Sequence, residues 1–163
     1  MSKPPYISYE AALAKLQSFC AYQERCHQEV RQKLLDLGVY GERLDEIIAD
    51  LIEDNFLNEE RFAHAFAGGK FRVKSWGRLR IQRELKAKNV SAYCIRKALK
   101  NELPEEEYFP KLLDLLRKKN RLLHKGDYYS RSKKLAQYAQ YRGYEAHLIW
   151  EAIKIVLNEE EEE

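Results

Sequence analysis

The sequence predicts an all-α protein of three tandem three-helix, helix-turn-helix-like repeats, arranged in an elongated array whose curvature stays open. Three observations predict this class. Only 4 prolines and 7 glycines occur in 163 residues, in a chain rich in Leu, Ala, Glu, Lys and Arg, which favours helix over sheet. Apolar residues recur at helical spacing, with no alternating strand pattern. One helix–turn–helix pattern also occurs three times.

The repeated pattern is centred on a turn. Three stretches keep the same apolar spacing without gaps: residues 30–48, 81–99 and 135–153. Each turns at a residue that tolerates the left-handed backbone of a helix end: Gly38, Asn89 and Gly143. The residue after each turn is apolar and should pack back on the preceding helix in a Schellman arrangement. The expected pairs are Leu34 with Val39, Leu85 with Val90, and Ala139 with Tyr144.

A further helix precedes each of these pairs. The first spans about Tyr9 to Tyr22, the second starts after the N-cap residue Asn58, and the third follows the Glu105–Glu107 cluster. The predicted repeats therefore cover residues 9–57, 58–103 and 105–158. Phe56 and Leu57 either pack at the first junction or are ordinary core residues. Units this small bury little apolar surface alone, so neighbouring units should pack end to end.

The acidic tail, residues 159–163, lies at the end of the last predicted helix. Negative charge is unfavourable at a helix C-terminus, so we expect this tail to fray. The alternative is that it competes within the molecule for the basic second repeat.

Charge is distributed unevenly along the chain. Residues 1–58 carry 6 basic and 10 acidic side chains, residues 59–100 carry 12 and 3, and residues 101–163 carry 11 and 13. A middle segment of net charge +9 between acidic flanks predicts an anionic partner for the second repeat. The alternative is a charged helix surface that only faces water.

The basic residues gather on one predicted helix, from Ser75 to Lys88, and just before it. Ile81 and Leu85 mark its inward face, which leaves Trp76 and Leu79 among cations on the other side. Arginine offers forked donors to phosphate or carboxylate, and tryptophan offers a stacking face. The candidate partner- and nucleic-acid-binding residues are Lys70, Arg72, Lys74, Trp76, Arg78, Arg80, Arg83, Lys86 and Lys88. Alternatively, Trp76 and Leu79 cover the neighbouring repeat.

Several function classes lack support in the sequence. It holds no Gly-rich phosphate loop and no hydrolase or zinc-protease motif, and its 4 histidines are scattered, so we expect no enzyme, cofactor or metal site. No secretory leader and no apolar run of membrane-spanning length is present. The 3 cysteines cannot all pair, which is typical of a reducing compartment. We expect a cytoplasmic monomer.

Four separated motifs resemble the RecX family, regulators of the RecA recombinase. They are Glu29 to Leu34 with Gly38; Leu57 to Ala63; Trp76 to Lys88; and Lys134 to Tyr144 with Ile149 and Ile153. The resemblance covers about residues 9 to 157 and departs from the family at Asn89, where glycine is usual, and in the acidic tail. It implies a helical repeat protein without catalytic residues. Such a protein docks in the groove of the RecA–single-stranded-DNA filament and inhibits strand exchange, ATP hydrolysis and coprotease activity during DNA repair.

A second hypothesis is a stand-alone DNA-binding protein, because three-helix units of this size dock in double-stranded DNA. Only one of the three repeats is strongly basic, however, whereas a dedicated DNA binder should carry more positive charge. The partners expected from the sequence are thus the RecA filament, single-stranded DNA and, under this alternative, double-stranded DNA.

Overall fold

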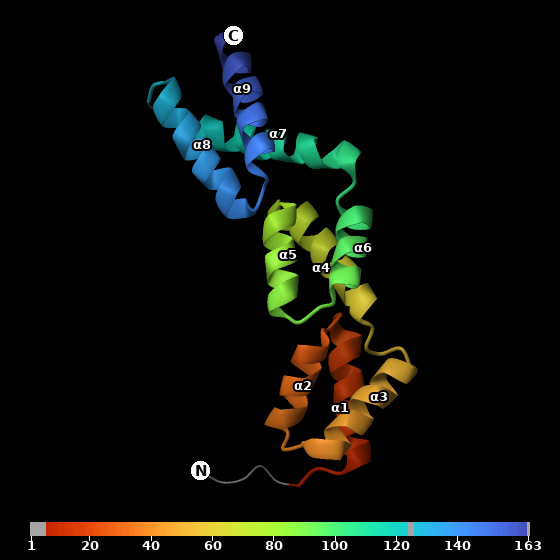
Figure 1. Ribbon diagram of the computed structural model, residues 1–163. Helices are drawn as coiled ribbons and strands as arrows, with labels where there is room; N and C mark the ends of the chain where they lie inside the picture. The colour runs from red at the N-terminus through yellow and green to blue at the C-terminus, as the bar shows by residue number, and fades with distance from the viewer. Residues whose placement is uncertain (1–5, 124–125, 163) are drawn as a thin grey trace.

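In the computed structural model, which describes residues 6–123 and 126–162, the chain is helical throughout, as predicted. The helices of this described part are α1 (Tyr9–Tyr22), α2 (His27–Asp36), α3 (Gly41–Glu53), α4 (Glu59–Lys74), α5 (Arg78–Ala87), α6 (Ala92–Glu102), α7 (Glu105–Leu122), α8 (Tyr128–Arg142) and α9 (Ala146–Glu162). They form three groups of three, here called the first, second and third groups. Figure 1 shows these groups stacked into an elongated array.

The turn at the centre of each group has the predicted Schellman geometry. The three turn residues have left-handed backbone, with φ of +83° at Gly38, +62° at Asn89 and +94° at Gly143. The amide of the residue after each turn residue then donates to the carbonyl five residues back: Val39 to Leu34 at 2.9 Å, Val90 to Leu85 at 3.1 Å, and Tyr144 to Ala139 at 3.3 Å. Asn89 therefore replaces glycine without changing this turn.

The N-termini of several helices are capped by their own side chains. Asn58 accepts a hydrogen bond from the Arg61 amide at 2.9 Å, and Ser8 does the same for Ala11 at 3.1 Å. These caps satisfy donors that the first helical turn leaves unpaired. The sequence predicted both the Asn58 cap and the bounds of α1.

The buried apolar residues form two separate clusters. The first lies within α1 to α3 and the segment that follows, from Ala12 to Leu57, with Phe56 packed against it. Phe56 and Leu57 are thus ordinary core residues of the first group. The second cluster runs without a break through the second and third groups, from Phe62 to Leu157, and also takes in Cys26. The last two groups therefore share one core.

The tail does not fray where the structure describes it, so that prediction is wrong. Helix α9 continues to Glu162. Glu159 pairs with Arg117 of α7, and Glu160 pairs with Arg131 of α8, both at 2.7 Å. These arginines offset the unfavourable charge at the helix end and lower the pKa of each carboxyl. Glu159 and Glu160 thus contact the third group and not the basic second repeat, and residue 163 lies outside the described residues.

In the described part of the chain, no helix has both the length and the apolar character needed to cross a bilayer. The same residues form no cluster of three or more His, Cys, Asp or Glu side chains that could hold a metal ion.

Candidate nucleic-acid interface

The candidate residues lie on the end of α4, on the turn after it and on α5. Helix α4 ends at Lys74, its C-cap residue Ser75 has left-handed backbone with φ of +57°, and α5 begins only at Arg78. The predicted single helix from Ser75 to Lys88 is therefore wrong at its start, because this reversal separates Trp76 from α5. Trp76 instead folds back on Phe66 of α4, with ring centroids 6.3 Å apart. It is half-buried, whereas Leu79 is 49% exposed.

Arg80 lies between two aromatic rings from different groups. Its guanidinium carbon is 3.9 Å from the centre of the Trp76 ring and 4.8 Å from that of Tyr141 on α8. It also donates to the Tyr141 carbonyl at 3.4 Å. Cation–π contacts of this kind hold the charge in a fixed place. Arg80 thus joins the second group to the third, and both Arg80 and Trp76 are only partly buried.

The joint between these two groups is made largely by the main chain. The Gly77 amide donates to the Arg142 carbonyl at 2.7 Å, and the Leu79 amide donates to the Gly143 carbonyl at 2.9 Å. A Cβ atom on Gly77 would lie 2.5 Å from the Gly143 carbonyl oxygen, and one on Gly143 would lie 2.4 Å from the Cβ of Arg80. Both glycines are therefore required for this close approach.

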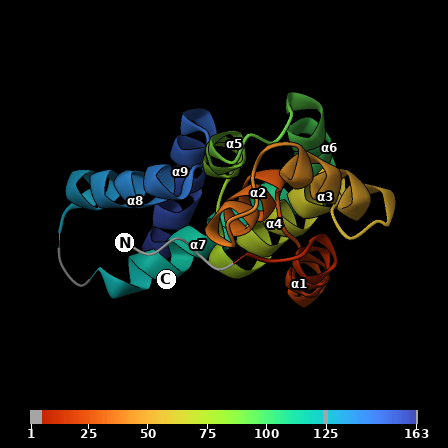
Figure 2. The same ribbon diagram turned by 90° about the horizontal axis from the view of Figure 1, so that it is seen from below.

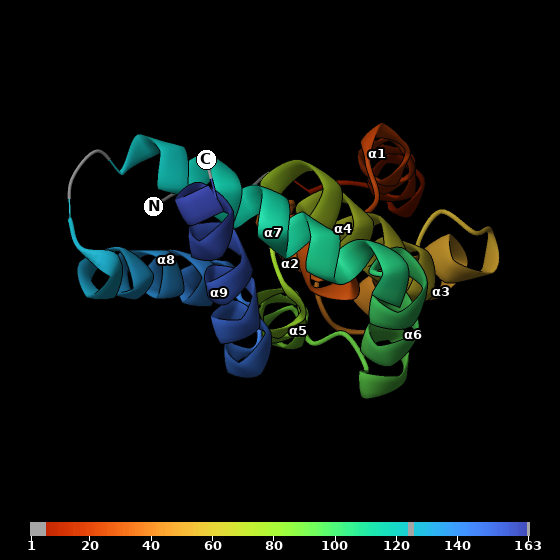
Figure 3. The same ribbon diagram turned by 90° about the horizontal axis from the view of Figure 1, so that it is seen from above.

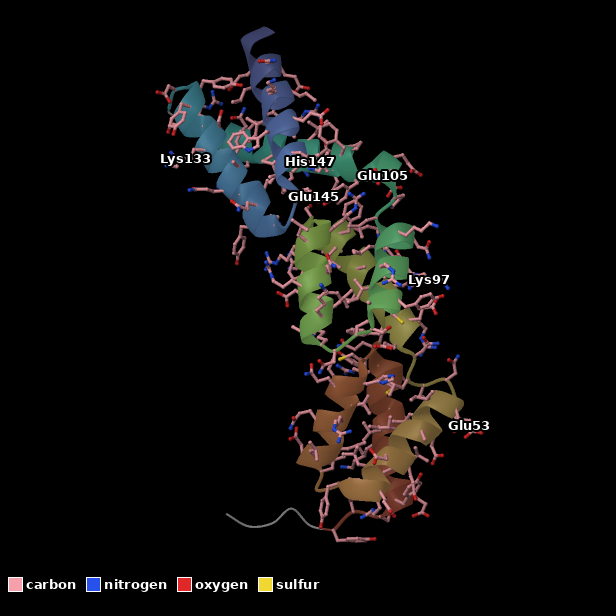
Figure 4. The ribbon with its side chains drawn as sticks, viewed as in Figure 1. Glu53, Lys97, Glu105, Lys133, Glu145 and His147 are labelled. Carbon is pink, nitrogen blue, oxygen red and sulfur yellow. The ribbon has the colours of Figure 1, made fainter. Side chains whose placement is uncertain are left out.

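Arg78, the first residue of α5, adds side-chain contacts to this main-chain joint. Its guanidinium forms ion pairs with Glu145 at 2.9 Å and Glu105 at 3.0 Å, and it lies 3.7 Å above the Tyr108 ring. The Tyr108 hydroxyl accepts from the Arg78 amide at 3.0 Å and donates to Glu145. Burial and this bond to Glu145 raise the pKa of Tyr108, which keeps its proton in place. Figure 4 labels Glu105 at the start of α7 and Glu145 just before α9, both at the end of the third group that faces the second.

Lys70 and Lys88 lie together over α4, near the first group. Lys70 is 4.8 Å from the Trp76 ring centre and 5.5 Å from that of Phe66, and Lys88 is 6.0 Å from Phe66. Both lysines line a hollow that also includes Glu24 and Glu29 of the first group. These nearby carboxylates offset part of their charge.

The remaining candidate cations differ in whether they form an ion pair. Arg72 is exposed but forms an ion pair with Glu102 at 3.0 Å. Lys74, Arg83 and Lys86 are exposed, and within the described residues no ion pair involves them. Arg83 and Lys86 are three residues apart on α5 and are therefore neighbours on its surface. The nine candidate residues thus divide into joint residues, partly neutralised cations and a smaller free set.

The joint residues contributed by the third group were not expected from the sequence. They are Tyr108, Tyr141, Arg142 and Glu145. Gly77 and Gly143 were the available signal, because glycine often marks a close approach of two backbones. Helical periodicity within one repeat does not say which neighbour will cover a residue.

Arg61 joins the first and second groups. Its guanidinium donates to the carboxylate of Glu24 and to the carbonyls of Asn55 and Phe56 at the end of the first group. Phe62 and Ala63, which follow it, are buried in the second core. The Glu-Arg-Phe-Ala segment is therefore structural.

Two family models match this chain: the second three-helix domain of RecX over residues 58–99 and the third over residues 105–153. Together they cover more than half of it. The chain belongs to the RecX family. It is 26% identical over 146 residues to the regulatory protein RecX of Bacillus cereus (strain B4264) and 28% identical to that of Bacillus cytotoxicus. These alignments cover 90% of the chain but only 54% and 52% of the relatives, about half their length.

Solved RecX structures share the fold. The crystal structure of RecX from Lactobacillus salivarius matches with a TM-score of 0.79 at 22% identity, over 91% of this chain and 96% of that one. A second crystal structure, of regulatory protein RecX, matches with a TM-score of 0.76 at 19% identity, over 94% and 81%. The family is one of regulatory proteins, and its all-helical architecture is the one predicted from the sequence.

Proposed function

We propose that this chain regulates the RecA recombinase by binding the RecA–single-stranded-DNA filament. There it modulates strand exchange, ATP hydrolysis and coprotease activity, mainly as an inhibitor, in DNA repair. Membership of a family of regulatory proteins supports a binding role without chemistry of its own. The described cysteines are free and buried, which supports action in the reducing cytoplasm, and we propose that the chain acts there as a monomer.

The observation that carries this proposal is the free cationic set, defined as Lys74, Arg83 and Lys86. Arg83 and Lys86 are exposed on α5, and Lys74 is exposed at the end of α4, two residues before the half-buried Trp76. Glu84 is the one acidic residue of α5. Phosphate groups of a nucleoprotein filament would replace water around these cations and release counterions. Binding should therefore weaken strongly as salt increases.

The elongated shape supports contact with more than one part of a filament. We propose the repeats at residues 9–57, 58–103 and 105–158 as the contacting units. Several modest contacts made by one chain give more affinity than any contact alone. The shared core of the last two groups keeps the second and third repeats at one fixed spacing.

The test uses RecA filaments preformed on single-stranded DNA. The wild-type chain should slow ATP hydrolysis and shorten the filaments, and the double variant Arg83→Glu with Lys86→Glu should lose most of this effect. Arg80 is left intact because it also holds the joint. Loss of two phosphate contacts should reduce the slope of log affinity against log salt by about 1.4.

The matched control is Arg96→Glu with Lys100→Glu. These residues are also exposed and in the second group, but they lie on α6, on the other flank from α5 in Figure 1. The control changes net charge equally and should inhibit like the wild type. If both variants lose inhibition equally, the effect depends only on net charge and the assigned residues are wrong. If the wild-type chain does not inhibit, the proposal is rejected. Tight, sequence-specific binding to double-stranded DNA alone would favour the stand-alone DNA-binding protein instead.

A further inference from the structure

Three exposed aromatic rings gather on the third group, away from the basic helix. Tyr128 and Tyr129 begin α8 and are 50% and 76% exposed, and Trp150 on α9 is 53% exposed. All three line one shallow pocket, together with Ser132 and Lys133. Exposed aromatic clusters are costly in water and commonly mark a binding site.

Lysines border this aromatic pocket. Lys133 lies within it, and Lys154 lines an adjoining pocket with Tyr128 and Trp150. In the described part of the chain neither lysine forms an ion pair, whereas Arg131 is paired with Glu160. Glu151 is the acidic residue at the α9 edge of the adjoining pocket. The side formed by α8 is therefore positive, and Figure 4 shows Lys133 on the outer side of this helix.

Ser132 lines both this pocket and the adjoining one. Ser132 is only 7% exposed, and within the described residues its hydroxyl makes no hydrogen bond. That oxygen is itself covered by protein atoms and does not face a ligand.

The pocket is continuous with the basic surface along α8. Residues four apart lie side by side on a helix, and the series Tyr129, Lys133, Gln137 and Tyr141 is exposed throughout. It covers about 18 Å of the helix axis. The last member of this series, Tyr141, contacts Arg80, so the exposed series ends at the Trp76–Arg80 contact. In the end-on views of Figures 2 and 3, α8 extends sideways beyond the first and second groups.

We infer that the third group carries a binding site for single-stranded nucleic acid. This site, here called the aromatic ridge, consists of Tyr128, Tyr129, Lys133, Tyr141 and Trp150. Bases stack on the rings of Tyr129 and Trp150, and Lys133 contacts the backbone phosphates. Stacking on aromatic side chains next to cations is the usual way in which proteins hold single strands. A duplex keeps its bases stacked inside and cannot offer them to these rings.

The chain contains only two tryptophans, which gives a direct test. The full-length variant Trp76→Phe leaves Trp150 as the sole indole. Its emission should be quenched by an oligodeoxythymidylate and not by a duplex of the same length. Tyr129→Ser in this background should weaken binding about 5- to 140-fold, as expected for the loss of one stacked base. Lys133→Glu, which keeps every ring, should also weaken it.

The matched control is Tyr22→Ser on α1, which removes an equally exposed ring far along the chain and should bind like its parent. The measurement contains no recombinase, so its result is independent of the proposed regulation of RecA. Oligonucleotide binding that neither quenches Trp150 nor responds to Tyr129→Ser would overturn the inference and place the strand elsewhere. Quenching by an acidic peptide but not by the oligonucleotide would overturn it in favour of a protein partner.

Discussion

Replacing Gly143 with alanine should break the main-chain joint between the second and third groups. The left-handed backbone at this position costs an alanine about 1 kcal/mol. Its Cβ would also lie 2.4 Å from the Cβ of Arg80 and 2.5 Å from its amide nitrogen, so the start of α5 must move away. A shift of about 1 Å restores normal contact. That shift breaks the two hydrogen bonds at Gly77 and Leu79, each contributing about 1 kcal/mol.

The expected total loss for Gly143→Ala is therefore about 3 kcal/mol. The matched control is Asn89→Ala, at the equivalent turn of the second group. This alanine also has to adopt left-handed backbone, but the turn makes no main-chain hydrogen bond to another group. Its loss should be about 1 kcal/mol. Urea unfolding followed by tryptophan fluorescence and circular dichroism measures both losses, and the two unfolding midpoints should differ by about 1 M. Equal losses within about 0.5 kcal/mol would refute the reasoning, because the close approach would then carry no free energy.

Two further perturbations test other contacts. Arg61→Ala should remove the hydrogen bonds to the carbonyls of Asn55 and Phe56 and the partly exposed ion pair with Glu24, which costs about 1–3 kcal/mol of folding stability. Limited proteolysis should then cut residues 54–58 faster than in the wild type. An unchanged cleavage rate would contradict this. The pKa of Glu159 is lowered by its bond to Arg117, so this contact stabilises the fold above the unfolded pKa, near 4.5, and is lost as pH falls through the lower folded pKa. The protection of the amides at the end of α9, relative to the exchange rate of an unfolded peptide at the same pH, should then fall in acid, and Arg117→Gln should show this lower protection already at pH 7.

The sequence was sufficient for the helices and turns because the physics there is local. Gly38, Asn89 and Gly143 each end a helix with a left-handed residue, and the apolar residue after each turn is buried as expected. The cap at Asn58 also depends only on residues within one turn. Such features need no knowledge of the neighbouring repeat.

The candidate site was predicted less well because its residues serve two repeats at once. Arg78 and Arg80 both carry positive charge, yet one is committed to Glu105 and Glu145 and the other to two rings. Periodicity within α5 cannot separate them from Arg83, which faces outward. The acidic tail shows the same limit, because the arginines that hold Glu159 and Glu160 come from α7 and α8.

The separation of the two apolar clusters has a consequence for the order of synthesis. Every member of the first cluster has been made once Leu57 leaves the ribosome, but the second needs residues up to Leu157. Translation of the intervening segment takes about 5 to 20 s, long enough for a small helical unit to fold. Cys26 belongs to the first group but is buried by the second cluster. Its thiol should therefore stay accessible to modification during synthesis until the second group closes over it.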